Sequence, residues 1–120
     1  MEKNSNSNRK SKVAIEIKKI LAEFLLRNSI VDPEESLNTS LISVTDVVVS
    51  ACLQNANVYI VSITENVSNE ECVQFLQKHK PKLRSHVGSS MRMKYTPEIR
   101  FFVDDSFKNA ARIDDLLKKI

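Results

Sequence analysis

Two runs of β-branched residues, separated by a turn-sized gap, place the tightest limit on the fold of this 120-residue chain. They are LISVTDVVVS at 41–50 and ANVYIVSIT at 56–64, with ACLQN between them. Runs of this kind so close together predict an antiparallel β-hairpin. A third run, EIRFFVDD at 98–105, has apolar residues at alternate positions and predicts a third strand.

Helical patterns surround these strands. Apolar residues recur at helical spacing from Ser11 to Asn28, and again after Asp105 or Ser106 towards residue 120. Ser68, followed three residues later by Glu71, is a capping box that opens a further helix. The pattern predicts one α+β domain over 11–120, a three-stranded sheet packed by helices in the order α-β-β-α-kink-α-β-α. Residues 1–10 are expected to be a flexible basic tail.

A proline interrupts the helical stretch QKHKPKLRSHVGSSMRMK at 77–94. Its ring disfavours helical geometry at the preceding residue, yet proline fits the first turn of a new helix. The sequence thus predicts a kink at His79, Lys80 and Pro81, then a second helix to about Met91. Leu83, Val87 and Met91 form the expected buried row of that helix.

Positive charge is concentrated in this stretch. Residues 72–97 carry six Lys/Arg and no acid, whereas residues 29–71 carry seven acids and no Lys/Arg. Two pairs at i, i+4 spacing, Lys80 with Arg84 and Lys82 with His86, lie off the buried row and should face solvent together. No acid in the segment offsets them, so an external polyanion is the expected partner.

We therefore expect an RNA-binding patch around the kink, made of Lys78, His79, Lys80, Lys82, Arg84, His86, Arg92 and Lys94. Arg9, Lys10 and Lys12 in the tail are expected to add a second contact. Gly88, the single glycine, has two interpretations: close helix packing, or close approach of an RNA backbone.

Several classes of protein are disfavoured. A single glycine rules out a Walker A loop, a GxGxxG turn and a GxSxG elbow. His79 and His86 have neither the spacing nor the cysteine neighbours of a metal site, so we expect no metal, no cofactor and no enzyme, and two solvated histidines. Cys52 and Cys72 are expected to be free thiols in a reducing cytoplasm. The apolar runs are too short to cross a membrane.

At the level of whole motifs, the chain resembles ribosome-binding factor A, a family of small bacterial ribosome-assembly factors. The residues that carry the resemblance are VAIEIKKILAEFL, IVDP, ISVTDVVVSACLQNANVYIVS, LRSHVGSSMRMKYTPEIRFFVDDS and RIDDLL, which span roughly 10–117. The resemblance implies a type II KH-like fold and binding to the free small (30S) ribosomal subunit or its precursor. It also implies a non-catalytic role in late maturation of the 16S rRNA 5′ region, especially in the cold.

This chain departs from the family pattern at one position, the kink, and alternative functions remain open. The family has an Ala-x-Gly kink between its two helices, and this chain has His79-Lys80-Pro81 there. The missing glycine removes its φ freedom, although proline can still enforce a bend. We expect a monomer when the protein is free. A protein-interaction module with separate acidic and basic faces is the alternative function, and a small enzyme is a weaker third.

Overall fold

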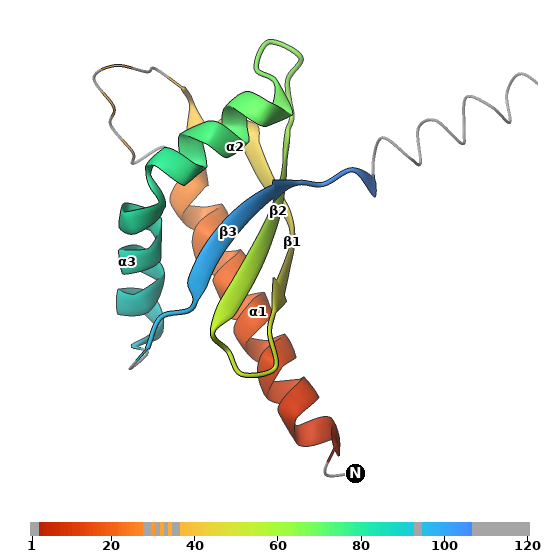
Figure 1. Ribbon diagram of the computed structural model, residues 1–120. Coiled ribbons are helices and arrows are strands. Elements are labelled where there is room, and N and C mark those ends of the chain that lie inside the picture. The colour runs from red at the N-terminus through yellow and green to blue at the C-terminus, as the bar shows by residue number, and fades with distance from the viewer. Residues whose placement is uncertain are drawn as a thin grey trace, which may run out of the picture.

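The computed structural model describes residues 3–27, 30, 32, 34, 37–92 and 95–106. Its elements are α1 (Lys3–Leu26), a short 3-10 helix (Thr39–Leu41), β1 (Ile42–Val49), β2 (Asn55–Ser62), α2 (Asn69–Lys78), α3 (Lys80–Met91) and β3 (Glu98–Val103). This α+β arrangement, shown in Figure 1, confirms the predicted fold class and the order of the elements as far as β3. The predicted last helix, from Phe107 onward, and Lys94 lie outside the described residues.

The sheet has the strand order β1-β2-β3. β1 and β2 form the predicted antiparallel hairpin, with Val47 opposite Val58, and the register shifts between Val44 and Asp46. β3 joins the other edge of β2 in parallel, with Val58 opposite Phe101. A parallel neighbour requires a long crossover, and α2 and α3 supply it.

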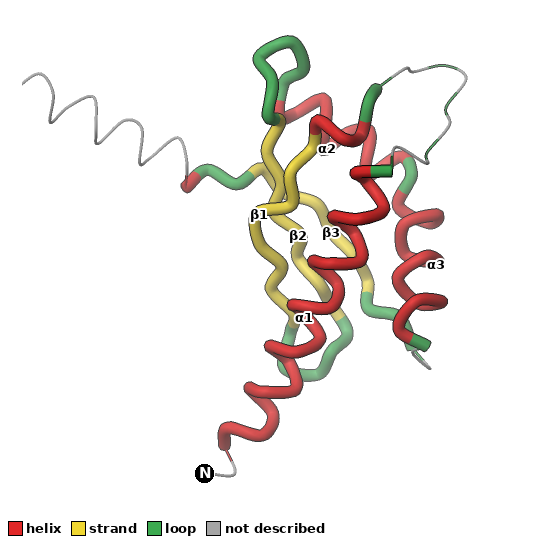
Figure 2. Tube along the Cα trace, turned by 180° about the vertical axis from the view of Figure 1, so that it is seen from behind, coloured by secondary structure: helices red, strands yellow, loops and turns green. Residues whose placement is uncertain are grey.

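The helices cover one face of the sheet, and α1 runs along it in Figure 2. The covered face is apolar because strand residues alternate: Val58 and Ile60 are fully buried, whereas Tyr59 between them is partly exposed. Four helical residues, Ile17 and Leu21 of α1 and Leu83 and Val87 of α3, are also fully buried. Leu83 and Val87 confirm the predicted buried row of α3, and Met91 at the end of that row is partly buried.

The first helix is longer than its apolar stripe indicates. The pattern places its start near Ser11, but α1 begins at Lys3 and its first turns extend beyond the sheet (Figure 1). The backbone of residues 3–10 thus continues the helix. A flexible tail over 1–10, separate from the domain, stays a prediction. None of the helices in the described ranges is both long and apolar enough to cross a membrane.

The capping and kink signals are confirmed. The Ser68 side chain accepts a hydrogen bond from the Glu71 N–H at 3.1 Å and begins α2. That helix ends at Lys78, and α3 begins at Lys80, so the chain bends at His79. Pro81 stands in the first turn of α3, where a missing N–H breaks no helical hydrogen bond.

Candidate nucleic-acid interface

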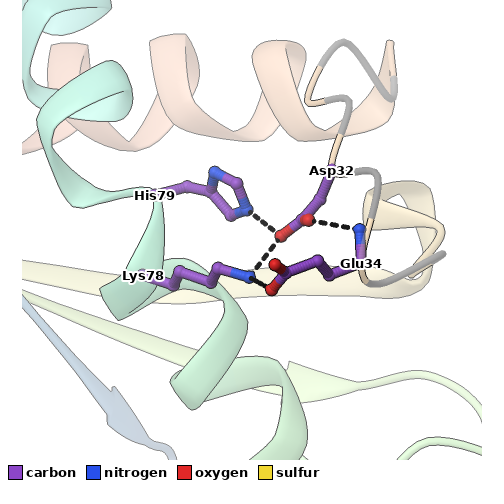
Figure 3. A network of polar contacts seen from close by, with 4 residues as sticks. All are labelled: Asp32, Glu34, Lys78 and His79. Carbon is purple, nitrogen blue, oxygen red and sulfur yellow. Dashed lines mark hydrogen bonds and ion pairs between the residues drawn. The ribbon is translucent and has the colours of Figure 1, made fainter.

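At the kink, the basic side chains meet a carboxylate from a distant part of the chain. Asp32 lies in the connection between α1 and β1, and its side chain is only 4% exposed. Lys78 Nζ lies 2.8 Å from Asp32 Oδ2, and His79 Nε2 lies 2.9 Å from the same oxygen (Figure 3). The backbone N–H of Glu34 donates to the other Asp32 oxygen at 2.9 Å. This network fastens the α1–β1 connection to the bend between α2 and α3.

These contacts act on the ionisation of Asp32. The hydrogen bond from Lys78, with that from the Glu34 N–H next, holds the pKa of Asp32 far below its ordinary value of 3.8, and His79 adds to the effect. The carboxylate is therefore ionised throughout the physiological pH range, and its negative charge balances the positive charge of Lys78. Lys78 also lies 3.5 Å from Glu34 Oε2.

A second acid meets the start of α3. Glu98, the first residue of β3, has its carboxylate 3.9 Å from Lys80 Nζ and 4.0 Å from Arg84 Nη1. Arg84 also donates to two backbone carbonyls, from Nη2 to Thr96 O at 2.8 Å and from Nε to Pro97 O at 3.2 Å. These bonds fix the guanidinium against the connection between α3 and β3.

Residues 72–97 contain no acid, but the inference that their charges therefore stay unpaired within the protein is wrong. The prediction considered only residues 72–97, and the three carboxylates come from outside that window, in Asp32, Glu34 and Glu98. Tertiary folding brings them to the helix corner. The ion pairs do not bury these cations fully: the side chains of Lys78 and Arg84 are 43% and 44% exposed.

Both histidines pack against aromatic rings, which contradicts the expectation that they are solvated. The His86 ring lies 4.3 Å from the Phe24 ring of α1, measured between centroids, and the His79 ring lies 4.6 Å from that of Phe75. His86 therefore faces the neighbouring helix rather than forming a solvent-exposed pair with Lys82. In the described part of the chain, no cluster of three His, Cys, Asp or Glu side chains could hold a metal ion.

The remaining predicted cations lie at the surface. Lys82 and Arg92 are exposed, and Arg92 ends α3 in the left-handed conformation with φ 53°. On α1, Arg9 and Lys12 are exposed and Lys10 is partly buried. The fold brings Arg9 and Arg84 to the wall of one hollow, so a residue of the expected tail and a residue of the patch lie at one site.

Gly88 now has a structural explanation. An ideal Cβ atom at residue 88 would overlap the hydroxyl oxygen of Thr96, and it would also lie 3.6 Å from the Thr96 Cβ. The glycine thus lets the α3–β3 connection lie against the helix, which is the close-packing interpretation. Sequence reasoning missed Thr96, Asp32 and Glu98 because nothing in their local patterns marks a contact with α3 or with the bend that precedes it.

Comparison with known proteins agrees with this architecture. A family model for ribosome-binding factor A matches residues 9–117. A Rickettsia bellii protein named ribosome-binding factor A is 35% identical over 113 residues, which cover 94% of this chain and 90% of that protein. This is a family of ribosome-binding factors and not of enzymes.

Solved structures show the same fold. The solution structure of a putative ribosome binding factor A from Thermotoga maritima has a TM-score of 0.65 and 29% identity, covering 78% of this chain and 85% of that one. A Thermus thermophilus ribosome binding factor A model, fitted into the map of a complex with the 30S subunit, has a TM-score of 0.58 and 22% identity over 77% of this chain and 91% of that one. Sequence and fold agree over most of the chain, which belongs to the ribosome-binding factor A family.

Proposed function

We propose that this chain binds the small (30S) ribosomal subunit or its precursor in the cytoplasm. It assists late maturation of the 16S rRNA near the 5′ end, including during growth in the cold, without catalysing a reaction. The match to the ribosome-binding factor A family over residues 9–117 carries this proposal. The Thermus thermophilus relative, described in a complex with the 30S subunit, supports the choice of partner.

The surface of α3 supplies a physical basis for contact with rRNA. Lys82 and Arg92 are exposed, so a phosphate of the rRNA can reach them. Arg84 and its partner Glu98 are both partly exposed, and ion pairs at such positions contribute only about 0–1 kcal/mol. A phosphate can therefore compete for Arg84, whereas Lys78 is held by the nearly buried carboxylate of Asp32. Phosphate contacts fix position rather than read sequence, as docking on a folded rRNA surface requires.

Co-sedimentation with 30S subunits across a salt series tests the patch. Charge reversal of Lys80 and Arg84 would disturb the fold, because both side chains lie next to Glu98. The test therefore uses the double variant Lys82→Gln with Arg92→Gln, which removes the charge of two exposed residues. The matched control is Arg100→Gln, which changes an exposed arginine of β3 between two buried residues. Each lost phosphate contact lowers the slope of log affinity against log salt by about 0.7–0.9.

The expected result is a smaller slope and weaker binding for the double variant, with the control unchanged. If the double variant binds with unchanged affinity and an unchanged salt slope, Lys82 and Arg92 do not contact the rRNA. Nuclease treatment distinguishes RNA binding from the alternative function, a protein-interaction module. A complex formed through RNA is lost after the treatment, whereas a complex formed only through ribosomal proteins survives.

The maturation role is tested in cells that lack this protein. We expect 16S rRNA with an unprocessed 5′ end to accumulate, most strongly in the cold, and the wild-type gene to reverse this. Normal rRNA processing at every growth temperature would contradict the maturation role while leaving subunit binding intact.

A further inference from the structure

A hollow of about 760 Å³ opens between the β1–β2 turn and the connection from α3 to β3. Its walls come from distant parts of the chain and include Arg9, Leu53, Gln54, Arg84, Tyr95 and Glu98. A neighbouring hollow of about 440 Å³ shares Arg84, Tyr95 and Thr96 with it. In Figure 1 the β1–β2 turn and the connection lie at the same end of the molecule. Both volumes fall in the range of about 300–1,000 Å³ that small-molecule sites occupy.

Arg84 and Tyr95, which line both hollows, contribute a cationic plane and an exposed aromatic ring to their walls. Two backbone carbonyls, of Thr96 and Pro97, hold the guanidinium of Arg84 in place. Tyr95 is 78% exposed. Unstacked RNA bases are commonly bound on aromatic rings and on guanidinium planes. A side chain that is already oriented loses less conformational freedom when a base stacks on it.

The rest of the wall suits the other parts of a nucleotide. Arg9 is exposed and can pair with a phosphate. The Gln54 amide and the Glu98 carboxylate can hydrogen-bond to base edges, and Glu98 is already positioned by Lys80 and Arg84. Leu53 has φ 60°, a conformation that non-glycine residues rarely adopt and that is frequent at binding sites.

We propose that this hollow takes an unpaired nucleotide of single-stranded RNA, with its base on Tyr95 and Arg84 and its phosphate at Arg9. The neighbouring hollow then accommodates the adjacent nucleotide. The proposal rests on the proposed function, because the 16S rRNA supplies the strand, and it deepens that function by assigning a base-binding site in addition to phosphate contacts.

Substitution of Tyr95 is the first test, with binding to 30S subunits as the measurement. Tyr95→Ala removes the stacking surface, and such changes weaken binding by about 5- to 150-fold. Tyr95→Phe keeps the ring and should bind within about twofold of wild type. Tyr95 is 78% exposed, so the alanine variant removes little buried surface, and urea unfolding of both variants checks that they fold like wild type. Equal affinity of the alanine variant and wild type would overturn the site.

Cys52 offers a second measurement, because it lines the same hollow. Cys52 is exposed, and a hydrogen bond with Ser50 lowers the pKa of its thiol, whereas Cys72 is buried and burial raises its thiol pKa. A maleimide should therefore label Cys52 selectively in the folded protein. Saturating 30S subunits should slow that reaction at least tenfold, and an unchanged rate would overturn the proposal.

A control thiol on the sheet, Arg100→Cys in a Cys52→Ser background, should react at the same rate with and without subunits. Irradiation at 254 nm then identifies the occupant. A nucleotide adduct on the tryptic peptide YTPEIR, residues 95–100, supports the proposal, and RNA adducts on other peptides of the protein with none on this one overturn it. Failure of wild type to co-sediment with 30S subunits would instead count against the proposed function.

Discussion

Gly88 of α3 lies against Thr96 so closely that a Cβ atom on residue 88 would overlap the threonine hydroxyl oxygen. The two residues belong to the helix and to the connection that leads from it to β3. Their contact fixes the distance between α3 and the segment that carries Tyr95 and Thr96, and Arg84 of the same helix is hydrogen-bonded to the Thr96 carbonyl. The glycine thus contributes to the candidate site through packing.

Gly88→Ala should lower the free energy of unfolding by about 1 kcal/mol. The overlap costs about 1–3 kcal/mol, and the better helix propensity of alanine returns about 1 kcal/mol. When Thr96→Ala removes the obstructing hydroxyl, the same substitution should instead stabilise by up to about 1 kcal/mol. Urea unfolding of the double-mutant cycle measures this change of sign.

Ser89→Ala, one position along at an exposed site of α3, is the matched control and should be neutral or slightly stabilising. If Gly88→Ala destabilises equally in both Thr96 backgrounds, the contact with Thr96 is not the cause.

Asp32→Asn should destabilise the protein in a pH-dependent manner. The pKa of Asp32 is lowered in the folded state by Lys78 and the Glu34 N–H, so the unfolded chain takes up protons first as the pH falls. The contribution of the carboxylate is fully present above about pH 5, and it is lost as the pH falls through 3.8 and below. The difference between wild type and variant should therefore be largest near neutrality and shrink below pH 4.

Urea midpoints at pH 7, 5 and 3 measure that difference. Glu34→Gln serves as the control, because the Glu34 side chain is 82% exposed and meets Lys78 only at 3.5 Å. It should change stability by less than about 1 kcal/mol. A gap between wild type and Asp32→Asn that stays constant from pH 7 to pH 3 would show that the ionised carboxylate is not responsible.

Thr39→Val should destabilise by about 1–3 kcal/mol. The fully buried hydroxyl of Thr39 donates to the carbonyl of Leu25, near the end of α1, at 2.6 Å. Valine keeps the shape but leaves that carbonyl without this donor. Thr39→Ser retains the hydroxyl and loses one methyl group, so it separates the hydrogen bond from packing. Thermal unfolding should rank wild type above serine and serine above valine, and a valine variant as stable as wild type would contradict the role of the bond.

Local signals in the sequence were sufficient for most of the fold. The hairpin follows from two β-branched runs with a short gap, and the start of α2 follows from Ser68 and its capping pattern. The bend at His79 follows from Pro81, whose ring acts on the residue just before it. Each of these rules operates over a few residues, which is why a single sequence reveals them.

The candidate site depended on contacts that such rules do not reach. Asp32 meets His79 across 47 positions of the chain, and Glu98 meets Lys80 from a strand beyond α3. Counting charges along the sequence could identify the basic stretch, but it could not show which acidic residues form ion pairs with it. Likewise, Arg9, Arg84 and Tyr95 belong to separate segments, and only the packed fold places them around one hollow.

The parallel pairing of β3 with β2 has a consequence for the order of folding. The β1–β2 hairpin is local and can form within microseconds, whereas β3 must close a loop of about 40 residues before it reaches its partner. During synthesis, β2 therefore keeps one edge open until the helical crossover and β3 have left the ribosome. The nascent chain has to protect that edge from pairing with other strands. Arg84 meets Glu98 only after β3 has paired with β2.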